Sequence, residues 1–362
     1  MAHYIRFLKQ PQIAKKNGDS FFITTLFTIT TDLGDSFLAE DVQLSATVQF
    51  ARPIAPLKQT VCWQAGSREQ KLTFGPIRRD LTNCTVQLCV RSVTEVMDAD
   101  SLNGPHIPRV VSAWSPLFEI SPGKRSVEKL VLRRFQPKIG AELKIWEETG
   151  NSIARHIWDA ALAAIVEFHD NFSHRGGKPL RQNDNHAFNV LELGSGCGIV
   201  GIALAQMMSN CSVMLTDLEE VREIIHRNIS TAQLAQSSLI EFQTLDWDEE
   251  LPQAVKDRRH DLILLSDCTY NSDALPALVR TIKSLLEISP GASVLVAWKK
   301  RCESELVFFD LMKDAALAVV GESSQAFLQV AAESDDDDDD DHEAPEIKIF
   351  RFQKASERQL AS

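Results

Sequence analysis

Residues 190–201, VLELGSGCGIVG, decide the fold that this sequence predicts. The stretch begins as an apolar run broken only by Glu192, and a second apolar stretch, Ile199 to Met208, follows it. A buried strand, a tight glycine turn and a helix in this order form a nucleotide-sized pocket at the carboxyl end of a strand in α/β sheets. The glycines of the stretch are Gly194, Gly196, Gly198 and Gly201.

Two classes of nucleotide are compatible with this glycine turn. Residues 196–201 also fit the dinucleotide fingerprint G-x-G-x-x-G, which is a weak signal by itself. A pyrophosphate binds backbone N–H groups and the positive end of a helix, and a neighbouring carboxylate disfavours it. Glu192 lies two residues before the first glycine. Its carboxylate instead favours a ligand with positive charge, such as the ammonium and sulfonium groups of S-adenosylmethionine (SAM).

A second acid supports a nucleoside site. Residues 211–216 form another apolar strand, and Asp217 closes it. An acid at this position accepts hydrogen bonds from a ribose diol in either cofactor class, so it indicates a nucleoside without identifying it. The plain alternative is a glycine turn flanked by surface acids. The order of strand, glycines, strand and acid, which a β-α-β unit requires, disfavours that alternative.

The composition limits the class of protein. At roughly 100–200 residues per domain, the 362 residues accommodate two domains. The net charge is −12, but the run Asp335–Asp341 supplies seven of the negative charges. The rest of the chain is only mildly negative, which argues against a nucleic-acid substrate held on a basic surface.

The cysteines and the N-terminus indicate a compartment. Seven cysteines, an odd number without a C-x-x-C pair, predict neither a disulfide framework nor a metal site. Reduced thiols are typical of intracellular proteins. The N-terminus lacks the apolar core of a signal peptide, and we expect no membrane span. We therefore expect the protein in the cytoplasm, the nucleus or both, without a membrane partner. We also expect it to be a monomer.

Residues 1–135 predict a β-rich domain whose role the sequence leaves open. Residues 42–50 alternate between apolar and polar side chains with a period of two, and residues 85–91 do the same. Shorter runs would complete a small antiparallel sandwich or sheet, namely 21–30, 60–64, 71–74 and 110–114. The domain carries no catalytic constellation. An interaction module and a lid on the second domain are both compatible with it.

Residues 136–355 predict an α/β domain, and residues 356–362 a short tail. After a join at 125–140, residues 153–168 mark a helix that Asn151 or Ser152 would cap. Strands and helices then alternate as far as a last helix at 303–319, and a loop joins the final two strands, which must therefore be antiparallel. The seven predicted strands begin with 190–193 and continue with 211–216, 239–245, 261–265, 293–298, 326–331 and 347–352.

Several stretches of this second domain resemble one family of enzymes. They are IWDAALA (157–163), LELGSGCGIVGIALA (191–205), LTDLEEVREIIHRNI (215–229), LDWDEE (245–250), SDCTYNSDALPALVRTI (266–282), VAWKKR (296–301) and ESELVFFDLM (303–312). Over residues 140–355 the chain resembles the class I, seven-β-strand methyltransferases. Within them it is similar to methyltransferase family sixteen, which contains the non-histone protein-lysine methyltransferases and some members labelled nicotinamide N-methyltransferase-like. The resemblance implies a Rossmann-like seven-stranded sheet with an antiparallel last strand, and SAM as cofactor.

The resemblance also implies roles for individual residues. Gly194, Ser195 and Gly196 would pass under the methionine part of SAM, and Asp217 would take the ribose hydroxyls. Ser266 would place its backbone near the cofactor.

Three further residues belong to the implied cofactor site together with Glu192. Asp246 and Trp247 would flank the adenine, where the indole offers a stacking face and the carboxylate accepts a hydrogen bond from the exocyclic amine. Trp158 would close over the cofactor. The alternatives are a core position for Trp247 and simple helix packing for Trp158.

The segment Asp267-Cys-Thr-Tyr270 is the candidate chemical site, because it follows the fourth strand and opens at the same edge of the sheet as the glycine turn. Adenine and glutamine N-methyltransferases of this fold carry Asn/Asp-Pro-Pro-Tyr. Cys268 and Thr269 replace both prolines here, which favours an amine as substrate. A lysine ammonium must lose a proton before it attacks a methyl group. We predict that Asp267 orients this group and that Tyr270 lines its channel. Alternatively, Asp267 only caps the next helix.

The run Asp335–Asp341 lies between the last two predicted strands. Such a run is usually a solvated loop. The sixth strand should end at the same edge of the sheet as the first and the fourth. We therefore also consider that the run attracts a lysine-rich protein substrate.

Three functions remain open at this point. The first is a SAM-dependent methyltransferase that acts on a lysine of an intracellular protein. The second is an N-methyltransferase for a small, nicotinamide-like amine or pyridine, for which the β-rich domain and the acidic run are unnecessary. The third is a catalytically silent SAM fold that serves as a binding module. The intact Glu192, Asp217, glycines and Asp-x-x-Tyr pattern argue against the third.

Overall fold

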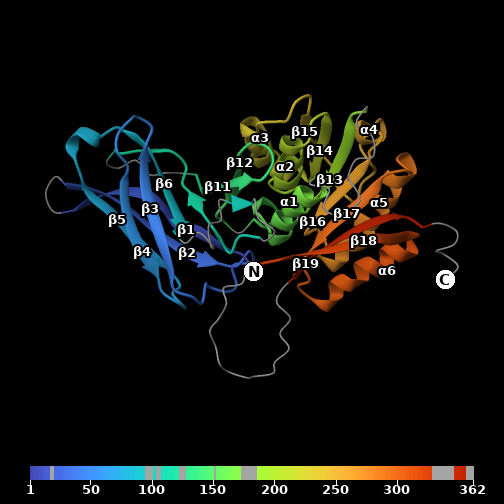
Figure 1. Ribbon diagram of the computed structural model, residues 1–362, viewed down its shortest axis with the longest axis horizontal. Coiled ribbons are helices and arrows are strands. Elements are labelled where there is room, and N and C mark those ends of the chain that lie inside the picture. Colours follow the sequence, from blue (N-terminus) through green and yellow to red (C-terminus); the bar gives the residue numbers. More distant parts are fainter. Residues whose placement is uncertain are drawn as a thin grey trace, which may run out of the picture. The chain divides into compact units, whose positions relative to one another are not determined.

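The computed structural model of the protein describes residues 1–16, 20–93, 101–102, 107–121, 128–150, 152–172, 186–327 and 346–355 (Figure 1). The chain divides into two compact units that interleave in the sequence. Unit 1 comprises Met1–Ser101, Pro108–Gln136 and Lys144–His156. Unit 2 comprises Leu102–Ile107, Pro137–Leu143 and Ile157–Ser362.

Unit 1 contains two β-sheets, whose first strands are blue in Figure 1. One sheet has the order β5-β2-β1-β8, and the other follows the path β12-β11-β9-β6-β3-β4. Strand β1 pairs antiparallel with β2 and parallel with β8. The strands are β1 (His3–Lys16), β2 (Ser20–Thr30), β3 (Val42–Phe50), β4 (Leu57–Trp63), β5 (Gln70–Ile77), β6 (Thr85–Ser92), β7 (Ser101–Leu102), β8 (Val110–Val111), β9 (Ala113–Trp114), β10 (Phe118–Glu119), β11 (Leu130–Pro137) and β12 (Leu143–Glu148), and η1 (Arg79–Leu81) is a short 3-10 helix.

The two sheets of unit 1 enclose a shared apolar core. Every second residue of β3 from Val42 to Val48 is buried, as the predicted period of two requires. Phe27 of one sheet packs against Trp63 of the other, with 6.1 Å between the ring centroids. The indole N–H of Trp63 donates a hydrogen bond to the Leu38 carbonyl at 3.0 Å. The predicted β-rich sandwich is therefore confirmed.

The structure corrects the sequence prediction at three strands of unit 1. Strand β1 is absent from the prediction because Pro11 and two register shifts between Phe7 and Gln12 interrupt its alternation. Strand β11 lies within the segment predicted as a join, where the buried Arg133 hides the apolar pattern. Strand β12 occupies the residues just before the predicted helix.

A buried ion pair ties the strands of unit 1 together. The Arg133 Nε donates to Glu147 Oε1 at 2.7 Å, and both side chains are almost completely buried. The Arg133 Nη1 donates to the carbonyls of Ile5 and Ser112, each at 2.7 Å. Burial alone would raise the pKa of Glu147, but Arg133, His156 and Arg6 together outweigh it and hold this pKa below its usual range. A charge buried in this way is stable only with its partner in place.

We expect Arg133→Ala to destabilise unit 1 by about 3–5 kcal/mol, because it leaves the Glu147 carboxylate buried without its partner. Urea denaturation of the full chain measures this loss. The control is Arg78→Ala, which removes an exposed pair with Asp80 and should change the free energy of unfolding far less, because solvent screens an exposed ion pair. Equal effects of the two substitutions would contradict the prediction.

Unit 2 is built on a seven-stranded sheet of order β15-β14-β13-β16-β17-β19-β18. Strands β15 to β17 in this order are parallel, and β19 is antiparallel to both β17 and β18. The predicted number of strands and the antiparallel last strand are therefore confirmed. The sixth strand was predicted in the wrong place, because it spans residues 317–326 and not 326–331. The strands are β13 (Phe188–Leu193), β14 (Cys211–Asp217), β15 (Leu239–Thr244), β16 (Leu262–Ser266), β17 (Ser293–Trp298), β18 (Leu317–Ala326) and β19 (Glu346–Lys354).

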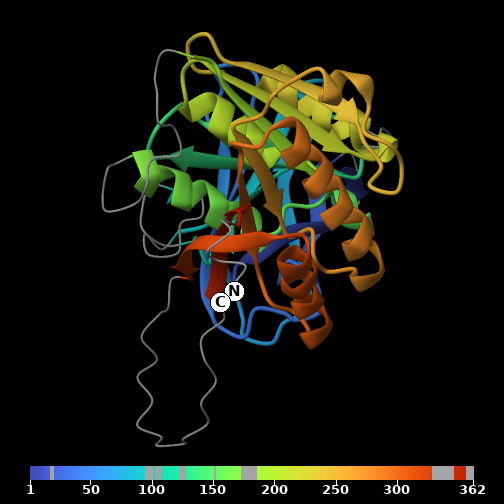
Figure 2. The same ribbon diagram turned by 90° about the vertical axis from the view of Figure 1, so that its right-hand side faces the viewer.

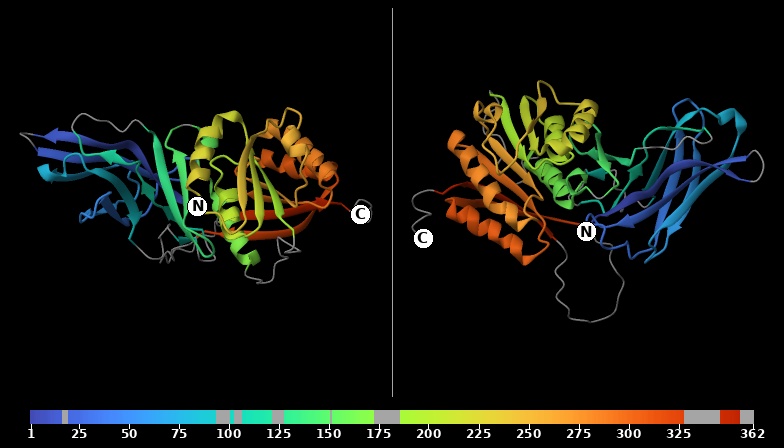
Figure 3. Two further views of the ribbon diagram at one scale, coloured as in Figure 1. Left: turned by 90° about the horizontal axis from the view of Figure 1, so that it is seen from above. Right: turned by 180° about the vertical axis from the view of Figure 1, so that it is seen from behind.

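Helices cover both faces of this sheet. Helices α5 and α6, orange in Figures 2 and 3, lie together on one face and share an apolar core with Leu191, Leu193 and Met214. Helix α2 packs on the other face, so closely that a Cβ atom at Gly201 would lie 2.4 Å from Leu215. The helices are α1 (Asp159–Phe172), α2 (Ile199–Met207), α3 (Arg222–Thr231), α4 (Gln253–Lys256), α5 (Leu275–Ile288) and α6 (Val307–Asp314), with 3-10 turns η3 (Ile153–Arg155), η4 (Glu219–Val221), η5 (Ser272–Ala274) and η6 (Glu303–Leu306).

The boundaries of two predicted elements of this part of the chain are wrong. The helix expected from residue 153 starts only at Asp159; Ser152 makes no side-chain capping bond, and Asn151 lies outside the described residues. The helix expected to reach residue 319 ends at Asp314, and β18 runs from 317 to 326. Ala316, with a φ of +59°, forms the turn between α6 and β18. The spacing of apolar residues gives no sign of this backbone conformation, so the predicted helix continued too far. The run 335–341 and the tail 356–362 lie outside the described residues.

Candidate active site

The carboxyl ends of four parallel strands place most of the predicted residues at one edge of the sheet of unit 2. The glycine turn follows β13, Asp217 ends β14, the LDW segment follows β15 and the DCTY segment follows β16. The glycine turn and the DCTY segment are in direct contact: the Cys268 thiol donates to the Leu193 carbonyl at 3.2 Å. The two motifs that were expected to act together therefore lie side by side.

The glycine turn is a rigid bend that leaves no room for side chains. Gly194, Gly196 and Gly198 have φ values of +63°, +55° and +77°, a region that favours glycine. A Cβ atom on Gly194 would lie 2.7 Å from the Cys268 sulfur and 3.2 Å from the Trp247 ring. The Ser195 backbone N–H donates to the Thr216 carbonyl at 3.0 Å. The Gly198 N–H donates to the Ser195 carbonyl at 2.7 Å, so these N–H groups bond within the protein and fix the shape of the turn.

Glu192 lies beneath this turn. It is 2% exposed, and its Oε2 accepts a hydrogen bond of 2.8 Å from the backbone N–H of Gly201 in the first turn of α2. Burial raises the pKa of Glu192 to about 8, although the bond from Gly201 opposes the shift. The side chain is therefore largely protonated at neutral pH until a positive charge approaches it.

Asp217 faces the same turn from the neighbouring strand. Its Oδ2 accepts from the Gly196 N–H at 2.8 Å, and its Oδ1 accepts from the Leu218 N–H at 2.7 Å. Burial raises the pKa of Asp217, and the two backbone hydrogen bonds act against this rise. The Leu245 N–H donates to the Asp217 carbonyl at 2.9 Å, which links the LDW segment to the end of β14.

The LDW segment supplies an aromatic face beside the glycine turn. Trp247 is partly buried, packs against the apolar core under α5 and lies over Gly194. Asp246 is exposed, and its Oδ1 accepts from the Asp248 N–H at 3.0 Å. The position of Trp247 is compatible with both predicted roles, namely a core residue and an adenine contact. The indole packs against the core and also lies next to the bend.

Within the DCTY segment, Asp267 has the left-handed φ of +56°. Its N–H donates to the Ala297 carbonyl at 3.0 Å, and its carboxylate forms an ion pair with Arg301. Asp267 does not cap the following helix, because the Asn271 side chain accepts from the Asp273 N–H there. The helix-cap alternative is therefore wrong.

Tyr270 and Ser266 lie on either side of this aspartate in the chain. Tyr270 is 52% exposed, and partial burial raises the pKa of its hydroxyl. Ser266 ends β16, and its carbonyl accepts from the Cys268 thiol at 3.4 Å. The Asp267 side chain is buried, whereas Tyr270 reaches solvent.

Two basic residues at this edge are absent from the sequence prediction. The Arg301 guanidinium carbon lies 5.2 Å from the centroid of the Trp158 ring. Lys299 Nζ lies 2.7 Å from Asp159 Oδ2, and both side chains are buried. The VAWKKR motif reveals that basic residues follow β17. It does not reveal their ion-pair partners, because these depend on the backbone conformation after the strand.

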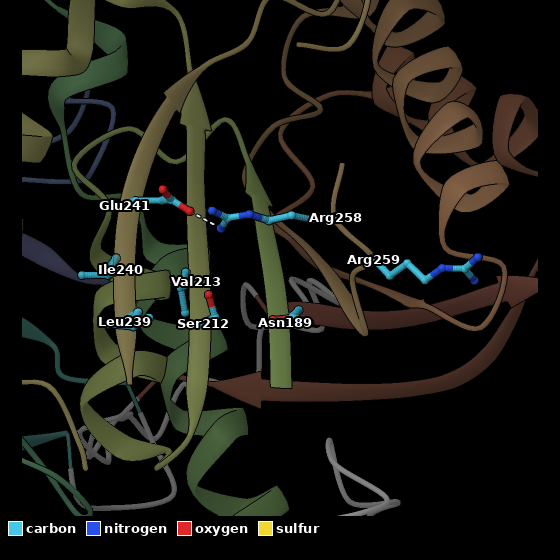
Figure 4. A pocket seen from close by; sticks show the side chains of 8 residues that line it. All are labelled: Asn189, Ser212, Val213, Leu239, Ile240, Glu241, Arg258 and Arg259. Carbon is cyan, nitrogen blue, oxygen red and sulfur yellow. Dashed lines mark hydrogen bonds and ion pairs between the residues drawn. The ribbon is translucent and has the colours of Figure 1, made fainter. Parts of the chain in front are cut away.

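A pocket of about 460 Å³ lies at the opposite, amino-terminal end of β13, β14 and β15 (Figure 4). Asn189, Ser212 and Leu239 line it, and Glu241 reaches across it to pair with Arg258. None of its lining residues belongs to the predicted site. We therefore place the candidate active site at the carboxyl ends of the strands, where the predicted residues lie, and not in this pocket.

The cysteines, possible metal ligands and helix lengths of the described residues bear on three further sequence expectations. All seven cysteines are free thiols, and Cys302 is the exposed one. Among the described residues, three or more His, Cys, Asp or Glu side chains nowhere gather as a metal site would require. No helix in the described ranges is long and apolar enough to cross a membrane.

The strand order, the glycine turn after β13 and the acid after β14 define a class I, SAM-dependent methyltransferase. A family model described as lysine methyltransferase matches residues 138–315. The chain belongs to this lysine methyltransferase family.

Three relatives support this membership. The UPF0665 family protein C23C4.06c of Schizosaccharomyces pombe is 31% identical over 326 residues, which cover 84% of this chain and 91% of the relative. Protein-lysine N-methyltransferase EFM6 of Saccharomyces cerevisiae is 30% identical over 194 residues, 49% of this chain and 77% of the relative. EEF1A lysine methyltransferase 3 of Xenopus tropicalis is 30% identical over 175 residues, 47% of this chain and 69% of the relative.

We expect SAM binding to release a proton from Glu192. The positive charge of the ligand favours the ionised form, so a group with a pKa of about 8 loses its proton on binding at pH 7. Affinity should therefore strengthen as the pH rises towards 8. Calorimetric titration with SAM in two buffers of different ionisation enthalpy counts the released protons.

The control for this experiment is Glu192→Gln, because groups on the ligand titrate equally in both proteins. The variant should bind SAM with less proton release at pH 7 and with a flatter dependence on pH. Equal proton release by the variant and the unaltered protein would show that Glu192 does not ionise when SAM binds.

Proposed function

We propose that this protein transfers a methyl group from SAM to a lysine side chain of an intracellular, non-histone protein. The observation that carries the proposal is the buried carboxylate of Asp267, which lies at the same edge of the sheet as the glycine turn. Membership of the lysine methyltransferase family supports it, as do relatives named protein-lysine N-methyltransferases.

The residues at this edge fit a nucleoside with a cationic group. Gly194 lets Trp247 approach the bend closely, so the indole offers a face to an adenine with Asp246 beside it. The carboxylate of Asp217 keeps lone pairs for ribose hydroxyls beyond its two backbone bonds. Glu192 would ionise under the bend as the cationic ligand binds, and SAM, when bound, supplies an activated methyl group.

The remaining assignments complete the proposed cofactor site. Ser195 and Gly196 present backbone groups to the methionine part of the cofactor, and Ser266 contributes its backbone at the end of β16. Trp158 closes over the cofactor from the segment before α1. These positions all belong to unit 2.

Asp267 and Tyr270 would receive the substrate amine. Tyr270 is half exposed and lines the entrance, whereas Asp267 is buried and accepts a hydrogen bond from the incoming nitrogen. Removal from water lowers the pKa of a lysine ammonium, which then gives its proton to solvent. The neutral nitrogen forms the new N–C bond while the S–C bond breaks and its electron pair remains on sulfur. Alignment is the main contribution of the enzyme, because the methyl group is already activated.

The names of the relatives suggest where to look for the substrate. One is named for EEF1A and another for calmodulin, so purified samples of these two proteins are suitable first substrates. We further propose a monomer that works in the cytoplasm, the nucleus or both. Seven free thiols are compatible with those reducing compartments.

Incubation of the full chain with tritiated SAM and a cell extract tests the proposal. A labelled protein whose label is found as methyl-lysine is the expected result. Label in small molecules only would favour the nicotinamide-like alternative. SAM binding without any transfer would favour a silent binding module, and either outcome would refute the proposal.

In this assay we expect Asp267→Asn to lower transfer about 100-fold or more, because general acid–base and orienting groups contribute on that scale. The affinity for SAM should stay within about threefold of the unaltered protein, which corresponds to less than 0.7 kcal/mol. The control is Asp273→Asn, an exposed acid of the neighbouring η5, which should retain full activity. Loss of SAM binding by Asp267→Asn would instead assign Asp267 to the cofactor.

We also propose that the acidic run Asp335–Asp341 guides a lysine-rich protein to the site. Exposed acids on the loops after β14 and β15, such as Glu220, Glu249 and Glu250, give the same edge a negative character. Replacement of the seven aspartates by serine should raise KM about tenfold at low salt with little change in kcat, because steering by charge acts on encounter. The difference should disappear at 0.5 M salt. An unchanged KM at low salt would exclude such guidance.

A further inference from the structure

The segment after β17 places Arg301 between two groups of the proposed site. Its Nη2 pairs with the Asp267 carboxylate, and its guanidinium lies 5.2 Å from the centre of the Trp158 ring. The side chain of Arg301 is 13% exposed, and that of Asp267 is 4% exposed. This ion pair is therefore shielded from water and from screening by salt.

The backbone around this pair is held in place from two sides. The Asp267 N–H donates to the Ala297 carbonyl at 3.0 Å, so the loop after β16 is bonded to β17 itself. Two residues before Arg301, Lys299 pairs with Asp159 at the start of α1. Lys299 is thus committed to another carboxylate, and Arg301 is the basic residue of this segment that meets Asp267.

The charge of Arg301 has a direct consequence for an incoming lysine. A lone buried carboxylate stabilises an ammonium and raises its pKa, which would keep the substrate in its unreactive form. A guanidinium stays protonated at any physiological pH. Its positive charge next to the carboxylate opposes a second cation and favours the neutral amine, as neighbouring cations do for reactive lysines in general.

The other titratable groups at this edge act in the opposite direction. Asp217 of β14 and Glu220 beyond it contribute to raising the pKa of Tyr270, and Glu192 of β13 and Asp217 contribute to raising that of Cys268, both after the larger effect of burial. Asp217 and Glu220, together with Glu192 once bound SAM has ionised it, surround the loop after β16 with negative potential and would favour an ammonium. The guanidinium is therefore needed to offset them at the point where the nitrogen reacts.

We propose that Arg301 is a positioning residue, which acts through Asp267 to fix the carboxylate and to present the substrate lysine as a neutral amine. The inference rests on the proposed function, because it assumes that Asp267 receives the amine. The proton leaves to solvent before transfer, and the nitrogen lone pair then forms the N–C bond as the S–C bond breaks.

The pH dependence of methyl transfer tests this inference. The probe is the protein labelled by the unaltered enzyme in extract, purified and used under single-turnover conditions with saturating tritiated SAM. Arg301→Gln should move the ascending limb of the rate profile to higher pH by roughly one unit. The rate at pH 7 should fall about tenfold and recover at alkaline pH. Arg301→Lys should return the limb most of the way, because it restores the charge.

Lys300→Gln is the matched control, since it removes the same charge from the adjacent, half-exposed residue, which pairs with Glu303. It should leave the profile unchanged. A loss of rate by Arg301→Gln that is equal at every pH, or a change of SAM affinity that accounts for the whole loss, would overturn the inference. Failure of the unaltered protein to label any protein would instead refute the proposed function, so the two failures are distinguishable.

Discussion

The close contact between the bend after β13 and the loop after β16 is the constraint on which the candidate site depends. Cys268 and Trp247 fill the space next to Gly194, so the bend tolerates no side chain there. Because β13 pairs in parallel with both β14 and β16, the chain leaves all three strands at one edge. A nucleoside held by the bend and an amine held by Asp267 would meet at this edge without any movement of the sheet.

Most of unit 2 was accessible from the sequence because its signals are local. The strands β13 to β17 each end in a short motif, and the glycines, Asp217 and the DCTY segment follow one another in the order that a doubly wound sheet requires. The number of strands, the antiparallel final strand and the contact between two motifs could be predicted in this way. The sixth strand could not be placed, because the turn at Ala316 made its first residues resemble the end of a helix. The roles of the individual site residues in binding and transfer stay predictions.

The features that sequence reasoning missed depend on turns or on distant partners. The VAWKKR motif does not reveal that Lys299 pairs with Asp159 and Arg301 with Asp267. The two side chains lie only two residues apart on an irregular segment, and the local backbone conformation determines which carboxylate each one meets. In unit 1, a buried arginine disguises β11, and its partner Glu147 lies on a strand just before the predicted helix that the sequence analysis did not identify. Charged residues are read as exposed unless their partner is known. The same reasoning explains why apolar periods found β3 and β6 but overlooked β1, β11 and β12.

The distribution of thiols gives this protein a practical property. Cys268 is buried against the bend, and burial raises the pKa of its thiol, whereas Cys302 is exposed and adjoins Arg301. Thiolates, not thiols, react with alkylating reagents, and access limits the rate. Cys62 is partly exposed, so a Cys62→Ser variant would direct a maleimide dye to residue 302, where its emission would report ligand entry at this edge.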